Sequence, residues 1–152
     1  MCGIAGYVGD RESADVLVDA LSKLEYRGYD SAGIAVFDHG NIKVKKCKGR
    51  LANLVEKMDE EGKPQGHVGI GHTRWATHGE PSDINSHPHG NKRVTIVHNG
   101  IIENYKKLKD FLIGEGYSFA SETDTEVAAK LLDYYYDGDP MKTIAKVLSE
   151  IK

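Results

Sequence analysis

The chain of 152 residues carries 20 Lys and Arg against 23 Asp and Glu, a formal net charge of -3, and 39% of its residues are hydrophobic. This length suits one domain with its own core, the apolar content is typical of a globular protein, and the acidic balance argues against nucleic-acid binding as its main role. No stretch approaches the roughly 20 apolar residues of a membrane span and no secretory signal is present, so we expect a cytoplasmic protein without membrane contact.

The first part of the chain shows strand patterns broken by two helical ones. An apolar, glycine-spaced run predicts a strand over residues 3–8, and a helix over 13–24 begins with a serine that can cap it. Strands over 32–37 and 42–47 are joined by Asp-His-Gly-Asn, which predicts a hairpin. A short helix follows over 51–58. The lysines of the second hairpin strand alternate with apolar residues and are expected on its solvated face.

The second part contains a long polar segment between two predicted strands. The strands cover 68–73 and 94–98, and the segment between them is of a length and composition that usually serves function. Helical patterns follow over 104–112 and from Thr123, whose Thr-Asp-Thr-Glu spacing is that of a capping box. A last helix starts near Pro140, with Ile144, Val147, Leu148 and Ile151 expected inward. Hairpins mixed with helices indicate an α+β fold with antiparallel sheets.

Cys2 stands directly behind the initiator methionine. If Met1 is removed, this residue carries both a thiol and a free α-amine, with ordinary pKa values of about 8.5 and about 7.7–8.0. A nucleophile needs a base within hydrogen-bond reach, and an amine on the same residue supplies one. The alternative is a small buried cysteine in a first strand. Without an export signal, we expect Cys2 and Cys47 to remain free thiols.

Two glycine-rich segments meet predicted strand ends. Residues 26–35 form a charged loop that runs into a strand and could be an ordinary turn. Residues 71–81 place a guanidinium (Arg74), an indole, a hydroxyl and an imidazole at a strand exit. Arginine can hold a carboxylate through two parallel hydrogen bonds, which lysine cannot match. The second segment is therefore the stronger candidate for binding an anionic group.

The pair Asn99-Gly100 has two interpretations. Asn-Gly is a common two-residue hairpin turn, but a helical pattern begins at Asn104 and leaves no room for a partner strand. The alternative is an oxyanion hole, with the Asn99 side-chain amide and the Gly100 backbone N–H aimed at one point.

The chain carries six motifs that together resemble one family, in the same order: Cys-Gly-Ile at 2–4, RGYDSAG at 27–33, GHTRWATHG at 71–79, HPH at 87–89, HNG at 98–100 and SETDTE at 121–126. They resemble the class II, N-terminal-nucleophile glutamine amidotransferases, and among these the N-terminal glutaminase domain of the glucosamine-6-phosphate synthases. Cys-Gly-Ile alone is shared by other class II members. Six motifs in order, spanning the whole chain, are much more specific.

The resemblance implies a role for each matching residue. Cys2 would attack the side-chain amide of L-glutamine, and its α-amine would move the proton. Asn99 and the Gly100 N–H would hold the oxyanion, and the thioester on Cys2 would be hydrolysed to glutamate after ammonia leaves. Losing one oxyanion donor typically lowers the rate about 10²–10³-fold.

The remaining matches concern substrate binding. Arg74, helped by Thr77 and His78, would bind the α-carboxylate of glutamine, and Asp124 would pair with its α-ammonium. Further pocket positions are implied for Trp75, in a loop that closes over glutamine, and for Arg27 and His87. The histidines lack the spacing of a metal site, so no metal or cofactor is expected.

For the architecture, the resemblance implies a four-layer αββα sandwich in which residues 2–152 form part of the amidotransferase domain and the C-terminal part is truncated. The helical pattern that runs to Lys152 without a glycine or proline agrees with a fragment. Ammonia would aminate fructose 6-phosphate in a C-terminal isomerase domain absent from these residues, in an enzyme expected to be a homodimer. The alternatives are a phosphoribosyl-pyrophosphate amidotransferase and a non-catalytic glutamine-binding module.

Overall fold

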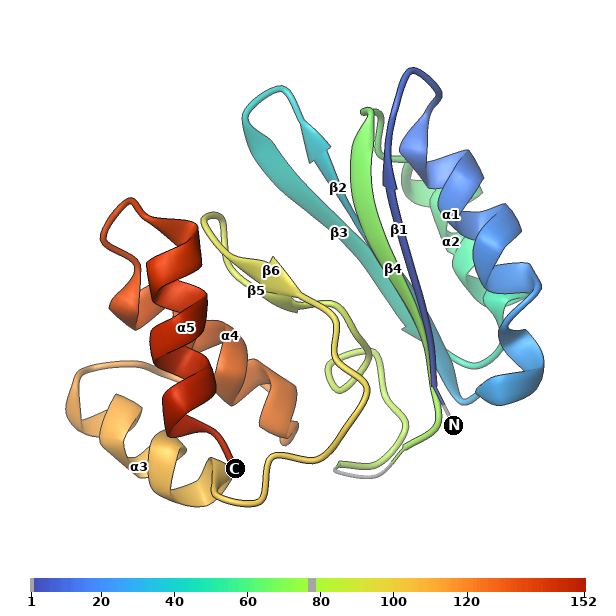
Figure 1. Cartoon of the computed structure of the whole chain (residues 1–152). Coiled ribbons are helices and arrows are strands. Elements are labelled where there is room, and N and C mark those ends of the chain that lie inside the picture. Colours follow the sequence, from blue (N-terminus) through green and yellow to red (C-terminus); the bar gives the residue numbers. More distant parts are fainter. Residues whose placement is uncertain (1, 77–78) are drawn as a thin grey trace.

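A computed structural model describes residues 2–76 and 79–152 and shows two β-sheets facing each other, with helices on both outer sides (Figure 1). The larger sheet has four strands in the order β1-β4-β2-β3, and every neighbouring pair is antiparallel. Its strands are β1 (Gly3–Val8), β2 (Ser31–Asp38), β3 (Asn41–Lys48) and β4 (Val68–Arg74). The predicted strand at 3–8 and the predicted hairpin are both confirmed.

The register of the larger sheet decides what meets at its end. Gly3 of β1 pairs with Thr73 of β4, and Ser31 of β2 pairs with Arg74. In an antiparallel pair the start of one strand lies beside the end of the other. Cys2, the start of β2 and the residues that follow β4 therefore gather at one end of the sheet.

Helices α1 (Ser13–Ser22) and α2 (Leu51–Glu61) cover the outer face of this sheet (Figure 1). Residues 31–36 of β2 are all buried, and every second one, Ala32, Ile34 and Val36, packs on the apolar stripes of the two helices. The core at this layer boundary includes Ala14, Leu17, Leu21, Ile34, Val36, Leu54 and Met58. Burying each larger side chain of this set contributes about 1.5–3 kcal/mol, which holds two short helices on the sheet.

The two ends of α1 correct the sequence prediction. Ser13 is the first helical residue rather than the cap, the N-cap position belongs to Glu12, and no side chain makes a capping hydrogen bond. Ser13 is fully buried because α1 packs closely over Gly69 of β4. The helix ends at Ser22, two residues before the predicted end, and a short 3-10 turn (Glu25–Arg27) follows it.

The larger sheet with α1 and α2 is one layer pair, and a second layer pair, again a sheet with helices, follows β4 in the chain. A small sheet of β5 (His89–Gly90) and β6 (Thr95–Ile96) lies between the larger sheet and α4 (Asp124–Tyr135), beside α3 (Tyr105–Gly114) and α5 (Pro140–Glu150) (Figure 1). Its core contains Ile102, Leu108, Leu112, Val127, Ala128, Leu131 and Val147. This is the predicted αββα layering. β5 was not predicted, and the strand expected over 94–98 is reduced to Thr95–Ile96.

The last helix begins where the sequence predicts, but the face that it buries differs from the predicted one. Pro140 is its first residue, and Asp139 caps it by accepting from the backbone N–H groups of Met141 and Lys142. Thr143 and Val147 are buried, whereas Ile144 is 43% and Leu148 63% exposed. The helix contacts α4, and Val147 joins the core there, so the inward face predicted from the apolar pattern was wrong at Ile144 and Leu148.

Lys46 of β3 joins the two layer pairs and corrects the expectation of a solvated lysine. Its Nζ donates to the backbone oxygens of Ile84 (3.3 Å), Ser86 (2.8 Å) and Pro88 (3.1 Å). Burial lowers the pKa of Lys46 to about 8. Beside it, a Cβ added at Gly33 would lie 2.0 Å from the backbone oxygen of His87. The segment before β5 is therefore pressed directly onto the larger sheet. In the parts of the chain that the structure describes, no helix has the length and apolar content needed to cross a membrane.

Candidate functional site

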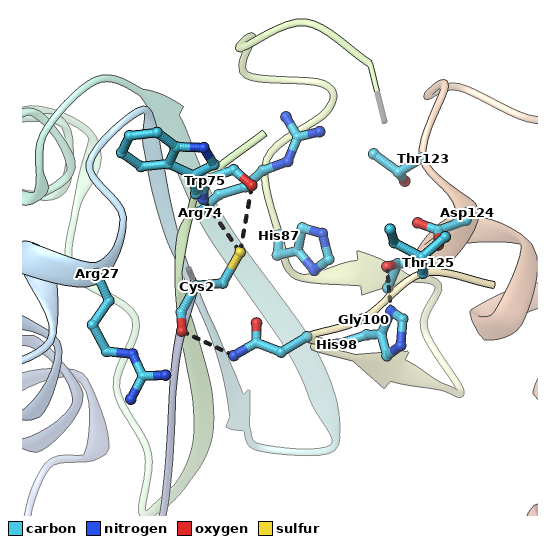
Figure 2. A pocket seen from close by; sticks show the side chains of 12 residues that line it. Cys2, Arg27, Arg74, Trp75, His87, His98, Gly100, Thr123, Asp124 and Thr125 are labelled. Atoms are coloured by element: carbon cyan, nitrogen blue, oxygen red, sulfur yellow. Dashed lines mark hydrogen bonds between the residues drawn. The ribbon is translucent and has the colours of Figure 1, made fainter. Parts of the chain in front are cut away.

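A cavity of about 480 Å³ opens where the starts of β1 and α4, the end of β4 and the loop after β6 meet (Figure 2). It is lined by Cys2, Arg27, Arg74, Trp75, His87, His98, Asn99, Gly100, Ile101, Thr123, Asp124 and Thr125. Each wall comes from a different part of the fold, so the cavity exists only when both layer pairs are assembled.

The thiol of Cys2 is half-buried and faces this cavity (Figure 2). The backbone N–H of Trp75 donates to its Sγ at 3.2 Å, and the Trp75 carbonyl oxygen lies 3.5 Å from the sulfur. A backbone N–H aimed at sulfur stabilises negative charge there. The other cysteine, Cys47, is a buried free thiol of β3, and burial raises its pKa. The two thiols therefore have very different access to solvent.

Asn99 reaches Cys2 across 97 positions of sequence. Its Nδ2 donates to the backbone oxygen of Cys2 at 3.0 Å, and its Oδ1 lies 2.8 Å from Nε2 of His72. At Gly100, an added Cβ would lie 2.8 Å from the ring of His98, so only glycine fits without displacing that ring. The pair lies in a loop and not in a hairpin turn, which agrees with the second of the two sequence interpretations.

Two buried charges stand on different walls of the cavity. Arg74, at the end of β4, is 3% exposed, and its Nη2 donates to the backbone oxygen of Gly79 at 3.0 Å. Burial lowers the pKa of this guanidinium, while the negative groups of Asp30, Cys2 and Asp124 act in the opposite direction. Asp124, the first residue of α4, is 4% exposed and accepts from the backbone N–H of Ile102 at 2.8 Å. The cavity thus presents a buried cation and a buried anion to the same ligand.

The segment of Trp75 is held by residues that the motif analysis quoted without a role. The Asp30 carboxylate accepts from the backbone N–H of Ala76, and the backbone N–H of Asp30 donates to the backbone oxygen of Arg74 at 3.2 Å. Trp75 is 50% exposed, and its ring packs edge-on against that of Tyr29, with ring centroids 5.7 Å apart. Asp30 and Tyr29 lie between the 3-10 turn and β2, within the glycine-rich segment 26–35, which therefore positions the cavity wall rather than forming an isolated turn.

Three buried histidines form a cluster at the cavity, in which His87 is part of the lining and His72 and His89 lie behind it. The rings of His72 and His87 stack with centroids 4.1 Å apart and planes 13° apart, and His87 meets His89 edge-on at 4.8 Å. Burial lowers the pKa of His72 to about 4 and that of His89 to about 3. The pKa of His87 is lowered as well, by burial and by the neighbouring His72 and His89. All three rings are neutral at neutral pH. Within 2–76 and 79–152, no group of three or more His, Cys, Asp or Glu side chains could hold a metal ion.

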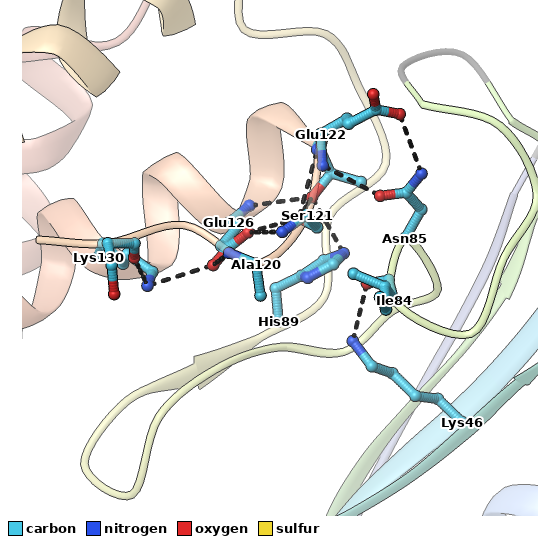
Figure 3. A network of polar contacts seen from close by, with 11 residues as sticks. Lys46, Ile84, Asn85, His89, Ala120, Ser121, Glu122, Glu126 and Lys130 are labelled. Carbon is cyan, nitrogen blue, oxygen red and sulfur yellow. Dashed lines mark hydrogen bonds and ion pairs between the residues drawn. The ribbon is translucent and has the colours of Figure 1, made fainter. Parts of the chain in front are cut away.

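A network of polar contacts fixes the start of α4, and with it Asp124 (Figure 3). Thr123 caps the helix as predicted, because its Oγ1 accepts from the Glu126 N–H, and it also lies 3.0 Å from Nε2 of His89. The Glu126 carboxylate does not complete the capping box but accepts from the N–H and hydroxyl of Ser121, both at 2.6 Å. Burial raises the pKa of Glu126, but hydrogen bonds from Ser121 and Ala120 outweigh this and lower it. Asn85 also holds this region, because its Oδ1 accepts from the Glu122 backbone N–H at 3.0 Å.

The structure gathers most of the predicted site residues around one cavity. Its lining includes the predicted Cys2, Arg27, Arg74, Trp75, His87, Asn99, Gly100 and Asp124. Thr77 and His78 lie outside the described residues. Sequence reasoning assigned no role to His98, Ile101 or Thr125 of the lining, or to His72 behind it. The signal for His72 and His98 was present, since each lies inside a quoted motif.

Comparison with known proteins gives a consistent result. Residues 72–151 match the glutamine amidotransferase domain family. The glutamine–fructose-6-phosphate aminotransferase (isomerizing) of Clostridium tetani is 58% identical over 154 residues, which cover 100% of this chain and 25% of that protein. The corresponding protein of Thermus thermophilus is 52% identical with the same coverage. The chain thus spans about a quarter of the length of the curated relatives it matches.

The solved structures support the fold. The glutamine phosphoribosylpyrophosphate amidotransferase from B. subtilis superposes with a TM-score of 0.83 at 27% sequence identity, covering 100% of this chain and 33% of that one. A structure described as the allosteric regulatory enzyme of purine biosynthesis gives a TM-score of 0.85 at 28% identity, with the same coverage. The α+β fold of an N-terminal-nucleophile amidotransferase, predicted from the motifs, is therefore confirmed.

Proposed function

This chain belongs to the glutamine amidotransferase domain family, and on that premise we propose that Cys2 hydrolyses the side-chain amide of L-glutamine to glutamate and ammonia. The single observation that carries this assignment is the cavity that joins an accessible thiol, a buried Arg74 guanidinium, a buried Asp124 carboxylate and the Asn99 amide. A free amino acid has a carboxylate and an ammonium group, and the buried Arg74 and Asp124 offer each of them an opposite charge.

Substrate selection follows from those charges. Arg74 binds the α-carboxylate, assisted by Thr77 and His78, and Asp124 pairs with the α-ammonium. Both protein charges are buried, so each attracts an opposite charge on the ligand more strongly than it would at the surface. Leaving either buried charge unpaired is unfavourable. A glutamine side chain within a polypeptide lacks both free charges and is excluded. The side-chain amide of a correctly bound glutamine is then directed toward Cys2.

The chemistry requires the removal of Met1, which exposes the α-amine of Cys2. The thiol proton passes to this amine as sulfur attacks the amide carbon, and the negative charge forms on the amide oxygen. The N–H groups of Asn99 and Gly100 stabilise that oxyanion. When the tetrahedral intermediate collapses, the nitrogen takes the proton and leaves as ammonia. Water then hydrolyses the Cys2 thioester by the same route and releases glutamate.

The remaining lining residues shape the access to the thiol. The half-exposed Trp75 ring stands at the mouth of the cavity and covers bound glutamine. Arg27 reaches the cavity from the 3-10 turn, and neutral His87 forms part of its lining. Exclusion of water by such groups strengthens the electrostatic contacts to substrate.

For the whole protein we propose a cytoplasmic glucosamine-6-phosphate synthase of the hexosamine pathway. Residues 2–152 are then part of its amidotransferase domain, and the ammonia aminates fructose 6-phosphate in a C-terminal isomerase domain of a homodimer. The support is the identity of 52–58% to glutamine–fructose-6-phosphate aminotransferases, against 27–28% to the two solved structures. Stimulation of glutamine hydrolysis by fructose 6-phosphate in the full-length protein tests the acceptor assignment.

The catalytic assignment is tested by intact mass before and after reaction with an electrophilic diazoketone analogue of glutamine. We expect loss of Met1 and one adduct, mapped to Cys2. The Cys47→Ala variant is the matched control, because Cys47 is buried and away from the cavity, and it should label as the parent does. Labelling of a Cys2→Ala variant at an undiminished rate, or unchanged hydrolysis by that variant, contradicts the proposal.

A further inference from the structure

His72 is buried near the end of β4 and reaches from the larger sheet to the loop after β6. It is 1% exposed, and its Nε2 lies 3.2 Å from the backbone oxygen of His98 and 2.8 Å from Oδ1 of Asn99. Both partners are acceptors, so Nε2 must carry the hydrogen and the tautomer of the ring is fixed. His72 is not part of the cavity lining and does not reach a substrate there.

This bond determines which way the Asn99 amide points. With Oδ1 held by His72, the amide nitrogen turns to the opposite side, where it donates to the Cys2 backbone oxygen at 3.0 Å. A flipped amide would set an N–H against the N–H of His72 and an oxygen against the Cys2 oxygen. Both contacts would be repulsive, so the two neighbours together select one orientation. One N–H of Asn99 is used on Cys2, and the other remains to serve a ligand.

The His72 ring itself is held in place. It stacks on His87 with centroids 4.1 Å apart and planes 13° apart, and it is packed inside the layer boundary. Burial lowers the pKa of His72 and keeps the ring neutral, and this outweighs the opposite effect of its hydrogen bonds to Asn99 and to the His98 backbone oxygen. The Asn99 oxygen is therefore held by a rigid donor and not by mobile water. Rigid support of this kind is what an electrostatic catalytic group requires, since its dipole must be in place before charge develops.

We propose that His72 is a positioning residue, whose Nε2–H holds the Asn99 side-chain oxygen so that the Asn99 amide N–H stays aimed at the oxyanion formed on glutamine. This inference rests on the proposed function, in which Asn99 donates to that oxyanion. It predicts that His72 affects the chemical step and not the binding of glutamine, because Arg74 and Asp124 carry the substrate charges on other walls.

The test compares His72→Leu, which has no donor, with His72→Gln, whose amide can place an N–H near the former Nε2. Both are measured in the full-length protein. We expect His72→Leu to lower kcat for glutamine hydrolysis about 10- to 100-fold with KM changed less than about threefold. His72→Gln should recover most of that loss. Alkylation of Cys2 by iodoacetamide, which forms no oxyanion, should stay within about twofold of the parent in both variants.

A double-mutant cycle with Asn99→Ala shows whether His72 acts through Asn99. If it does, His72→Leu should lower kcat less than about twofold further once Asn99 is already alanine. Additive losses, or a raised KM with unchanged kcat, overturn the inference. If Asn99→Ala alone leaves kcat unchanged, the oxyanion role of Asn99 in the proposed function is overturned instead.

Two further variants separate positioning from general loosening of the fold. Val36→Ala removes a fully buried side chain of neighbouring β2 that faces the helices, and it should leave kcat unchanged while lowering the melting temperature. If His72→Leu fails to melt cooperatively, His72→Asn replaces it, because its amide is one methylene shorter than that of glutamine and falls short of Asn99. Equal kcat in the Asn and Gln variants then overturns the inference.

Discussion

Asp124→Asn separates the two tasks of the first residue of α4. The carboxylate accepts from the Ile102 N–H at 2.8 Å, and the oxygen of an asparagine can keep this bond. Only the negative charge is lost, at a position that is 4% exposed. The folded state should therefore change little, by about the 0.3–1 kcal/mol that a negative charge contributes at a helix N-terminus.

The loss for glutamine binding should be much larger. Removing one partner of a buried, hydrogen-bonded charge pair costs about 2–5 kcal/mol. Retention of the amide dipole places this change toward the lower part of that range, at about 2–4 kcal/mol, which is about 30- to 900-fold in kcat/KM for glutamine.

The assay compares L-glutamine with glutaric acid monoamide, which has the carboxylate and the amide but no α-ammonium. The parent should strongly prefer glutamine, and in Asp124→Asn the ratio of the two kcat/KM values should fall by the same 30- to 900-fold factor. The matched control is Asp133→Asn on the same helix, whose carboxylate binds Arg93 and Tyr117 away from the cavity. It should lower stability and leave the ratio unchanged. An unchanged ratio in Asp124→Asn would refute the pairing of Asp124 with the substrate ammonium.

Two further predictions concern the contact between the layers. Gly33→Ala places a Cβ 2.0 Å from the His87 backbone oxygen and should destabilise the fold by at least about 2 kcal/mol. Gly6→Ala is the control, because nothing lies within 4 Å of the added Cβ, and it should be neutral. Equal denaturation midpoints for the two variants would contradict this prediction. Lys46→Met should reduce the slope with which the free energy of unfolding increases with pH. Burial lowers the pKa of Lys46 from 10.5 to about 8, so between these values the unfolded state binds more protons and the free energy of unfolding increases with pH. The same slope in the parent and in the Met variant, measured by urea denaturation, would exclude this contribution.

Much of the fold could be predicted because it is local. The strand at Gly3–Val8 follows from an apolar run, the hairpin from its turn residues, and the start of α4 from the Thr123 cap. Each of these rests on backbone conformations and hydrogen bonds within a few residues. The boundaries that failed, at Ser13 and at the strand predicted over 94–98, are those where packing against a distant element overrides local preference.

The candidate site was predictable for a different reason. Cys2, Arg74, Asn99 and Asp124 lie in motifs whose residue types carry their own chemistry. These are a thiol next to a chain start, a guanidinium at a strand exit, an amide before glycine and a carboxylate at a helix start. Those motifs also identified the family that the comparisons show. Residues that act on other protein groups were missed, because a histidine such as His72 has no sequence pattern that names its partner.

The sequence by itself determined the family, the strand and helix types and the set of chemical groups at the site. Only the tertiary structure decided how they combine: it set Asn99 against Cys2 across 97 positions, buried Lys46 under three backbone oxygens, and turned Ile144 and Leu148 of α5 to solvent. Short-range patterns specify backbone conformation and an apolar face. Which face is covered, and which polar atoms lose water, depends on elements far apart in the chain, because burial and hydrogen-bond partners are properties of the assembled layers.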